Sequence, residues 1–359
     1  MPGVYISYPF CTQKCSFCNF ASGVSSPATV ADYSARLLDE VRDHKWASFP
    51  ETVYFGGGTP SLMDPLLFSS LLSAIPRQKC TEVTLECAPG TITRDRLHLW
   101  NREGINRISL GVQSFVASEL RQTGRRHTAE IVASDIGALR SVGISNVNVD
   151  LIAGLPGQTL ASWNESLVWI ERLAPPHVSI YIFEIDEDSR LGKEALLGGI
   201  RYGAELLPPD DLTAELYERA AERLAAMGIP RYEISNFARP GFESRHNLKY
   251  WQLEPYIGFG LDAHSFDGCV RWSNPDSLDE YLARPAHELT ETNRDEEQFF
   301  VGLRLSRGIQ PTPAQWLHYQ QPIDKWRALG MLERDGDRLR LSARGILVSN
   351  EILQDFIHA

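Results

Sequence analysis

Short apolar runs alternate with amphipathic stretches through the first two-thirds of the chain. The runs are rich in β-branched and aromatic residues and end in Gly or polar residues, a pattern typical of buried strands. We predict strands at 4–9, 52–55, 82–87, 107–112, 147–152 and 178–183. The stretches between them place apolar residues at helical spacing, as Tyr33, Leu37 and Val41 do, and predict helices at 30–44, 65–74, 94–103, 129–142 and 160–173.

Strands separated by helices predict an α/β fold with a parallel sheet and right-handed crossovers. The periodicity does not decide between a doubly wound open sheet and a sheet curled into a barrel. In both arrangements the functional groups gather at the carboxyl ends of the strands. The residues that follow each predicted strand are therefore the first candidates for a site.

The last third of the chain follows a different pattern. A helix is predicted at 211–227 and a strand at 231–237, whereas 238–290 is rich in Gly, His and aromatic residues and has little periodicity. Helices surround a short hairpin with an Asp335-Gly336 turn, which indicates a winged-helix-like α+β module. The predicted domains are 1–237, 238–290 and 291–359.

Composition excludes some functional classes. The 359 residues are 43% hydrophobic and 23% charged, an ordinary globular balance, with a net charge of −11. This acidity disfavours nucleic-acid binding, which needs clustered Lys and Arg. The sequence has no run of about 18 apolar residues that could span a membrane, and its start does not resemble a signal peptide. We therefore expect a cytoplasmic protein.

Three of the six cysteines form a C-x3-C-x2-C motif at Cys11, Cys15 and Cys18. In a reducing compartment such a group indicates metal binding rather than disulfides. Three thiolates on one loop can hold three irons of a [4Fe–4S] cluster and leave the fourth iron open to the amine and carboxylate of S-adenosylmethionine (SAM). The alternative is structural zinc, which needs a fourth Cys or His, and the nearest His, His44, lies at the far end of a predicted helix.

Further unusual residues collect at the predicted strand ends. Gly56, Gly57 and Gly58, with Thr59, follow the second strand, where the absence of side chains lets the backbone approach a ligand. Polar side chains also interrupt the next three strands, at Glu86, Gln113 and Asp150. A buried carboxylate needs a partner, which a ribose diol or an ammonium group would supply. The alternative is a salt bridge within this edge, to Arg125 or Arg126.

Five segments together resemble the oxygen-independent coproporphyrinogen III dehydrogenase superfamily of radical SAM proteins. They are residues 5–18, 56–61, 84–91, 110–115 and 149–159, and the resemblance extends to the C-terminal residues 330–351. It implies a partial (β/α)6 radical SAM barrel with a small C-terminal domain. It also implies the following site: cluster ligands Cys11, Cys15 and Cys18; SAM contacts Gly57, Gly58, Thr59, Glu86, Gln113, Arg125 and Asp150; and Tyr5 close to the active centre.

Within this superfamily the sequence resembles the HemW-type heme chaperones more than the dehydrogenases. The dehydrogenases have a segment before the cluster strand and a further Cys where this chain has Phe20. The chain also contains the H-N-x-x-Y-W signature linked to heme binding in that branch, formed by His246, Asn247, Tyr250 and Trp251. An imidazole can ligate heme iron and the aromatic rings offer flat apolar faces. Alternatively, His246 only hydrogen-bonds a loop and the aromatic residues belong to the core.

Three functions follow as hypotheses. The first is a chaperone that binds heme and passes it to acceptor proteins, with homodimerisation an open question. The second is a coproporphyrinogen III dehydrogenase, and the third is another radical SAM enzyme, such as a methyltransferase, because a fold does not fix a function. The chain departs from the usual family pattern at Ser7, Tyr8, Cys87, Leu261 and Asp262, and these departures bear on substrate handling more than on the cluster.

Overall fold

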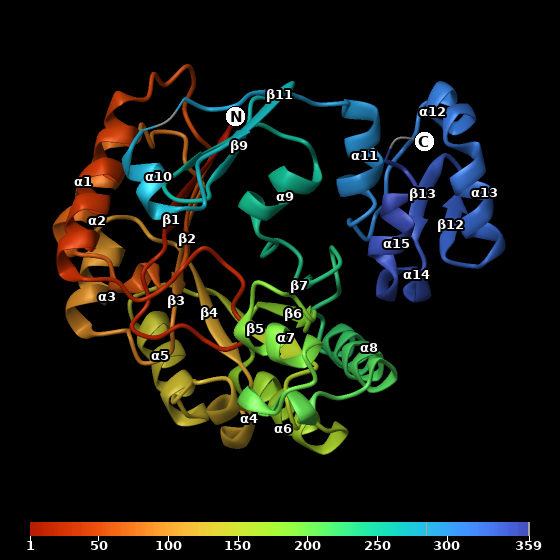
Figure 1. Ribbon diagram of the computed structural model, residues 1–359, viewed down its shortest axis with the longest axis horizontal. Coiled ribbons are helices and arrows are strands. Elements are labelled where there is room, and N and C mark those ends of the chain that lie inside the picture. Colours follow the sequence, from red (N-terminus) through yellow and green to blue (C-terminus); the bar gives the residue numbers. More distant parts are fainter. Residues whose placement is uncertain (285, 358–359) are drawn as a thin grey trace.

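The computed structural model describes residues 1–284 and 286–357. In this part of the chain, eleven strands form one sheet (Figure 1). Its centre consists of parallel strands: β1 (Gly3–Tyr8), β2 (Thr52–Gly57), β3 (Glu82–Cys87), β4 (Arg107–Gln113), β5 (Asn146–Ala153) and β6 (His177–Ile182). These six strands confirm the sequence prediction. Each begins and ends within three residues of its expected position.

Five shorter strands extend this sheet on both sides. They are β7 (Asn236–Ala238), β8 (Tyr256–Phe259), β9 (His264–Phe266), β10 (Val270–Ser273) and β11 (Thr290–Glu291). The order is β11-β10-β9-β8-β1-β2-β3-β4-β5-β6-β7, so β7 and β11 are the edges and the described sheet is open rather than a closed barrel. Segment 238–290, which has little periodicity, thus continues the same sheet through β8, which pairs in parallel with β1.

The predicted strand at 231–237 is wrong for most of its length. Only residues from 236 onward join the sheet, antiparallel to β6. The preceding residues turn back on themselves: Tyr232 N–H donates to the carbonyl of Asn236 at 3.0 Å, and Glu233 accepts from Ser235 N–H at 3.2 Å. The apolar residues of this segment therefore mark a tight buried turn, which periodicity cannot distinguish from a short strand.

Helices cover one face of the central strands. They are α1 (Pro27–Asp43), α2 (Pro65–Ala74), α3 (Arg94–Arg102), α4 (Ala117–Gln122), α5 (Ala129–Ser141) and α6 (Leu160–Leu173). Two 3-10 turns, η1 (Pro60–Leu62) and η2 (Arg201–Leu206), and four more helices complete this part: α7 (Arg190–Leu196), α8 (Asp210–Ala226), α9 (Arg245–Trp251) and α10 (Leu278–Leu282). Side-chain caps begin most of these helices, as when Ser26 accepts from Thr29 N–H at the start of α1, whereas α8 follows Pro209 without one.

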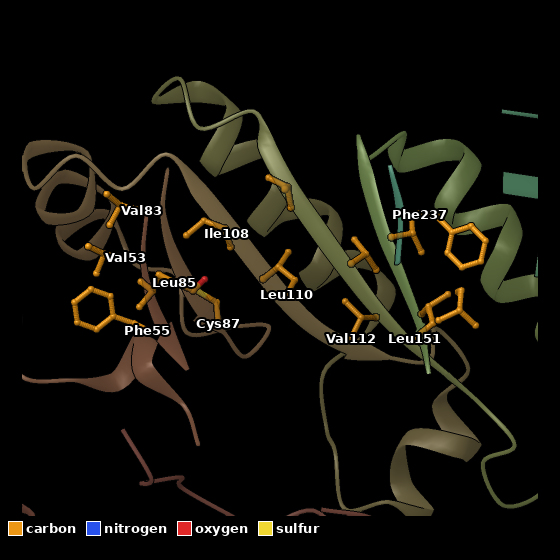
Figure 2. Close-up of a cluster of buried hydrophobic side chains, with 14 of the residues drawn as sticks. Val53, Phe55, Val83, Leu85, Cys87, Ile108, Leu110, Val112, Leu151 and Phe237 are labelled. Atoms are coloured by element: carbon orange, nitrogen blue, oxygen red, sulfur yellow. The ribbon is translucent and has the colours of Figure 1, made fainter. Parts of the chain in front are cut away.

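The two faces of the central sheet differ in polarity. Alternate residues of a strand point to opposite faces. One set is apolar and buried against the helices, and Figure 2 shows Phe55, Leu85, Ile108 and Leu110 of neighbouring strands in this layer. The other set is polar on every central strand and includes Tyr5, Tyr54, Thr84, Glu86, Ser109, Asn148, Asp150 and Ser179. A ligand site on this second face would not disturb the core.

The C-terminal residues form a small unit beside the sheet (Figure 1). It comprises α11 (Arg294–Gly302), α12 (Pro313–His318), α13 (Gln320–Ala328), β12 (Leu332–Asp335), β13 (Arg338–Leu341), α14 (Ala343–Leu347) and α15 (Ser349–Gln354). Phe299, Tyr319 and Phe356 are buried together in its core, with ring centroids 4.2–5.8 Å apart. The predicted hairpin is confirmed, with Gly336 at φ +62° in its turn.

Candidate functional site

The three motif cysteines lie on the loop that leaves the carboxyl end of β1. All three are free thiols and partly exposed. At the base of the loop, Cys11 N–H donates to Gly23 O at 2.9 Å and Gly23 N–H to Pro9 O at 2.8 Å. In its middle, Ser16 N–H donates to Thr123 O at 3.2 Å. These bonds hold the thiols on one short, anchored segment.

The donor set fits a [4Fe–4S] cluster better than a single metal ion. Burial raises the pKa of Cys11, the nearby Cys18 and Cys15 raise it further, and the Thr59 hydroxyl, 3.4 Å from the sulfur, partly offsets them. A structural zinc site takes four Cys or His ligands, and this loop supplies three cysteines. Each cysteine of a cubane cluster binds a different iron, so thiols spread along a loop suit it.

The glycines after β2 hold this loop against the sheet. A Cβ on Gly58 would lie 2.8 Å from the backbone of Pro9 and of Phe10, so no other residue fits there without moving the loop. Gly58 N–H donates to Tyr8 O at 2.8 Å, and Thr59 N–H donates to Phe10 O at 2.9 Å. The backbone amides of Gly58 and Thr59 are therefore occupied by the end of β1 and by the start of the cysteine loop. Contact between SAM and the other atoms of this turn stays a prediction.

Two carboxylates stand on the polar face beside this loop. Glu86 accepts from the Tyr54 hydroxyl at 2.8 Å, and Asp150 accepts from Asn148 Nδ2 at 2.6 Å and Ser109 Oγ at 3.2 Å. Burial raises the pKa of Glu86 to about 7 and also raises that of Asp150. In the described structure neither has a salt bridge to a Lys, Arg or His. A ligand with hydroxyl or cationic groups would supply the missing partner.

Gln113 and Arg125 join the end of β4 to the cysteine loop. Gln113 follows a register shift in β4 and has a φ of +70°, rare for a residue with a side chain. Arg125 Nη1 donates to Gly111 O, and its guanidinium lies 5.8 Å from the ring of Phe17, between the second and third cysteines. Arg125 Nε is buried without a hydrogen-bond partner in the described structure. Such a group is suited to bind a ligand carboxylate in bidentate fashion.

These observations bring every predicted SAM residue to one edge of the sheet, the carboxyl ends of β1–β5. The salt bridge from Glu86 or Asp150 to Arg125 or Arg126, which was the alternative to ligand binding, is not seen among the described residues. The sequence interpretation missed Tyr54, Ser109 and Asn148, which orient the two carboxylates. The sequence pattern that could have revealed these three residues is a polar residue at every second position of an otherwise apolar strand.

Comparison with known proteins places this site in a family. Residues 5–170 match the radical SAM superfamily model, and residues 289–348 match the HemN C-terminal domain. The chain is 30% identical to the heme chaperone HemW of Lactococcus lactis, covering 98% of this chain and 96% of that one. It is also 30% identical to the HemW of Bacillus subtilis, covering 99% of each. The chain belongs to the HemW family of radical SAM proteins.

Membership of this family carries its two radical SAM cofactors, the [4Fe–4S] cluster and SAM, and the donor set described above fits both. A solved structure of Escherichia coli HemN, described as coproporphyrinogen III oxidase, superposes with a TM-score of 0.85 over 99% of this chain and 90% of that one. At 21% sequence identity this likeness establishes the fold, including the partial radical SAM barrel and the C-terminal domain.

The H-N-x-x-Y-W signature lies at the opposite end of the sheet from the cysteines. It forms α9, which packs against the first residues of β2 and β3. The carboxylate of Glu82 accepts from the N–H groups of Arg245 and His246, at 3.0 Å each, and so caps the helix. Since the cysteines follow the last residue of β1, the length of the strands separates the two motifs.

His246 is enclosed and fully hydrogen-bonded. Its side chain is 1% exposed, Nδ1 lies 2.8 Å from Thr52 Oγ1, and Nε2 lies 2.8 Å from the Tyr250 hydroxyl. Its ring stacks on Tyr54, with centroids 5.1 Å apart, and burial lowers its pKa to about 3. Neither nitrogen is available to heme iron in this arrangement. Heme ligation by His246 stays a prediction that requires these contacts to break.

The other signature residues differ from one another in environment. Tyr250 packs edge-on against Tyr256, with centroids 4.5 Å apart. Trp251 lies under the guanidinium of Arg304 at 5.5 Å, and its Nε1 is buried without a partner among the described residues. Asn247 lies in the first turn of the helix, where its N–H donates to Oγ of the capping residue Ser244 at 3.3 Å. In this structure α9 therefore resembles a packed helix rather than an open binding surface.

Proposed function

We propose that the protein is a heme chaperone, which binds heme and passes it to acceptor proteins. Its similarity to proteins named heme chaperone HemW, over nearly the full length of both chains, is the observation that carries this proposal. The sequence also supports this proposal, because the chain has Phe20 at the position where the dehydrogenases have a further cysteine. The acceptor, homodimerisation and a cytoplasmic location stay predictions.

We assign the carboxyl edge of the sheet to cluster and SAM binding. Cys11, Cys15 and Cys18 hold the cluster, and SAM completes the coordination of its open iron. Arg125 pairs with the ligand carboxylate, while Glu86 and Asp150 accept from its ribose hydroxyls and offset its positive charge. Tyr5, whose ring lies 6.0 Å from that of Tyr54, forms the neighbouring wall.

An anaerobic heme titration of the cluster-reconstituted protein tests the chaperone proposal. We expect saturation near one heme per chain with a shifted Soret band. Apomyoglobin added afterwards should acquire this heme faster from the protein than from an equal concentration of heme on albumin. Absence of specific heme binding would overturn the proposal.

The dehydrogenase is a second candidate because the fold matches HemN over almost the whole chain. The same reconstituted sample, supplied with SAM, a reductant and coproporphyrinogen III, tests it. The chaperone proposal expects no decarboxylated porphyrinogen. Product formation without heme binding would favour the enzyme.

No helix in 1–284 or 286–357 combines the length and the apolar character needed to cross a membrane. Cell fractionation with tagged full-length protein tests the predicted location.

A further inference from the structure

One arginine on the polar face of the sheet has no counter-ion. Arg107, the first residue of β4, is 1% exposed, and its Nε is buried without a hydrogen-bond partner among the described residues. None of the salt bridges in the described part of the chain includes it. A cation removed from water needs an opposite charge or several hydrogen bonds to compensate it. The groups around Arg107 therefore decide whether the protein itself supplies this compensation.

The residues on both sides of Arg107 in the sheet are also incomplete. Thr84 of β3 and Asn146 of β5 pair in register with Arg107, so the three side chains share one face. Thr84 is 0% exposed, and neither its hydroxyl nor the buried Oδ1 of Asn146 has a hydrogen-bond partner among the described residues. Three neighbouring strands thus contribute one unpartnered polar atom each. Such atoms are rare in folded proteins, so three at one place indicate a bound group.

The carboxylates of the same face are engaged elsewhere. Glu82, at the start of β3, accepts from the first N–H groups of α9, and Glu86 accepts from the Tyr54 hydroxyl. Asp150 accepts from side chains of its own strand and of β4. Burial raises the pKa of both Glu86 and Asp150 in spite of the charge of Arg107. None of the three carboxylates therefore neutralises Arg107 directly.

Exposure along the polar face decreases from the carboxyl ends of the strands to Arg107. Tyr181, near the end of β6, is 42% exposed, and Glu86 and Tyr54 are partly exposed. Tyr54 pairs in register with Thr84, so solvent reaches the direct neighbour of this residue. At the amino ends of β2 and β3 the docked helix α9 closes the face. A molecule that reaches Arg107 therefore enters from the carboxyl edge.

We propose that Arg107 and Thr84 bind a carboxylate group at this closed end of the polar face. A guanidinium offers a carboxylate two parallel N–H donors, and the Thr84 hydroxyl donates one more hydrogen bond. The negative charge compensates Arg107, which a water molecule cannot do. Oδ1 of Asn146 needs a donor instead, so it accounts for an ordered water beside the carboxylate. The site is independent of the proposed function, because a free small carboxylate or a side chain of a larger ligand can supply the group.

Saturation-transfer NMR on the methyl signal of acetate tests this site in the cluster-reconstituted protein without SAM. The samples are the parent, Arg107→Met, Thr84→Val and, as a matched control, Arg239→Met, which alters an exposed arginine. We expect Arg107→Met to weaken acetate binding by at least about tenfold and Thr84→Val by about threefold, because hydrogen bonds to charged groups are the stronger ones. Arg239→Met should keep the parental affinity.

Two results would overturn the proposal. Equal acetate affinities in the parent, Arg107→Met and Thr84→Val would assign buried water to the three unpartnered atoms. Formate should displace acetate, whereas displacement by chloride at the same concentration would show a site for any small anion rather than for a carboxylate. Circular dichroism and cluster iron content identify a variant that has not folded. If this is Arg107→Met, the comparison of Thr84→Val with the parent decides.

Heme, which carries two propionates, identifies the source of the carboxylate. If one equivalent of heme abolishes the acetate signal of the parent and heme dimethyl ester does not, a propionate occupies the site. An acetate signal that persists beside bound heme assigns a free small carboxylate to Arg107. If the parent binds no heme, the chaperone proposal fails, but the acetate comparison still tests Arg107. The two failures are therefore distinguishable.

Discussion

The two ends of the polar sheet face carry similar residues in opposite states. At the carboxyl ends of the strands, Glu86 and Asp150 accept hydrogen bonds but form no salt bridge in the described structure, and Arg125 Nε is buried there without a hydrogen bond. At the amino ends, Glu82 caps α9 and both nitrogens of His246 are bonded. The carboxyl end thus lacks salt bridges for its carboxylates, whereas Glu82 and His246 at the amino end are hydrogen-bonded. Arg107 Nε of β4 and Trp251 Nε1 of α9 are exceptions at the amino end, because both are buried without a partner among the described residues.

This difference distinguishes residues that can bind a ligand from residues that support the fold. Charged groups taken out of water are nearly always paired with an opposite charge, so carboxylates and a guanidinium that have no salt bridge indicate a ligand. A network in which each member is satisfied stabilises the fold and leaves nothing to bind with. Residue types alone do not distinguish the two ends, because both present carboxylates, aromatic rings and hydroxyls. The partners of each group make the distinction.

The largest effect should come from a side chain placed where the cysteine loop crosses the sheet. In Gly58→Val the new side chain would displace the backbone of Pro9 and Phe10, which it would meet at 2.8 Å. We expect nearly complete loss of the cluster absorbance and iron after reconstitution, while circular dichroism stays close to that of the parent.

Gly23→Val is the matched control, because Gly23 lies at the base of the same loop with no atom within 4 Å of its Cβ position. It should bind a full cluster. Equal iron contents in the two variants would show that the crossing at Gly58 does not position the cysteines.

A smaller effect, on stability, is expected at the closed end. His246→Ala leaves a cavity and removes partners from Thr52 and Tyr250, which should lower the free energy of unfolding by about 3 kcal/mol. Denaturant unfolding of the parent and variant measures it. The exposed His264 serves as the control, and its alanine variant should stay within about 0.5 kcal/mol of the parent. An unchanged midpoint for His246→Ala would mean that α9 is not the closed support described above.

The central fold could be predicted from sequence because six apolar runs alternate regularly with helical stretches. The periodicity could not reveal β8–β11, since these strands are two to four residues long and contain Gly, His and Trp without alternation. The strand predicted at 231–237 was wrong because a buried turn is as apolar as a strand. Short elements are defined by tertiary pairing, which a local pattern does not contain.

The site could be predicted where chemistry requires a rare residue type. Cys11, Cys15 and Cys18 stand at a distinctive spacing, and Gly58 is needed because the loop backbone crosses it. Tyr54 was missed because a tyrosine in a strand is ordinary. The closed state of His246 resembles the alternative left open by the sequence, which could not choose it because the partners Thr52 and Tyr250 are meaningful only once α9 is docked on β2.

The smallest predicted effect is a change of stability with pH, and it tests whether Glu86 belongs to the binding edge. Burial is the largest cause that raises the pKa of Glu86, from 4.5 to about 7. The folded protein therefore holds a proton that the unfolded chain releases, so this contribution to stability is present below pH 4.5 and is lost as the pH rises through 7. Glu86→Gln keeps a neutral acceptor for Tyr54 at every pH. Relative to the parent, it should gain about 2 kcal/mol of unfolding free energy between pH 4.5 and pH 6.5.

Denaturant unfolding of both proteins at several pH values, without SAM, measures this gain. Asp150 and Glu233 also have raised pKa values, but their effects are present in both proteins and largely cancel in the difference. SAM should reverse the trend, because a cationic ligand favours the ionised Glu86 and will stabilise the parent more than the variant at pH 8. A stability difference that does not change with pH would place Glu86 among satisfied groups, like those under α9, and would remove it from the binding edge.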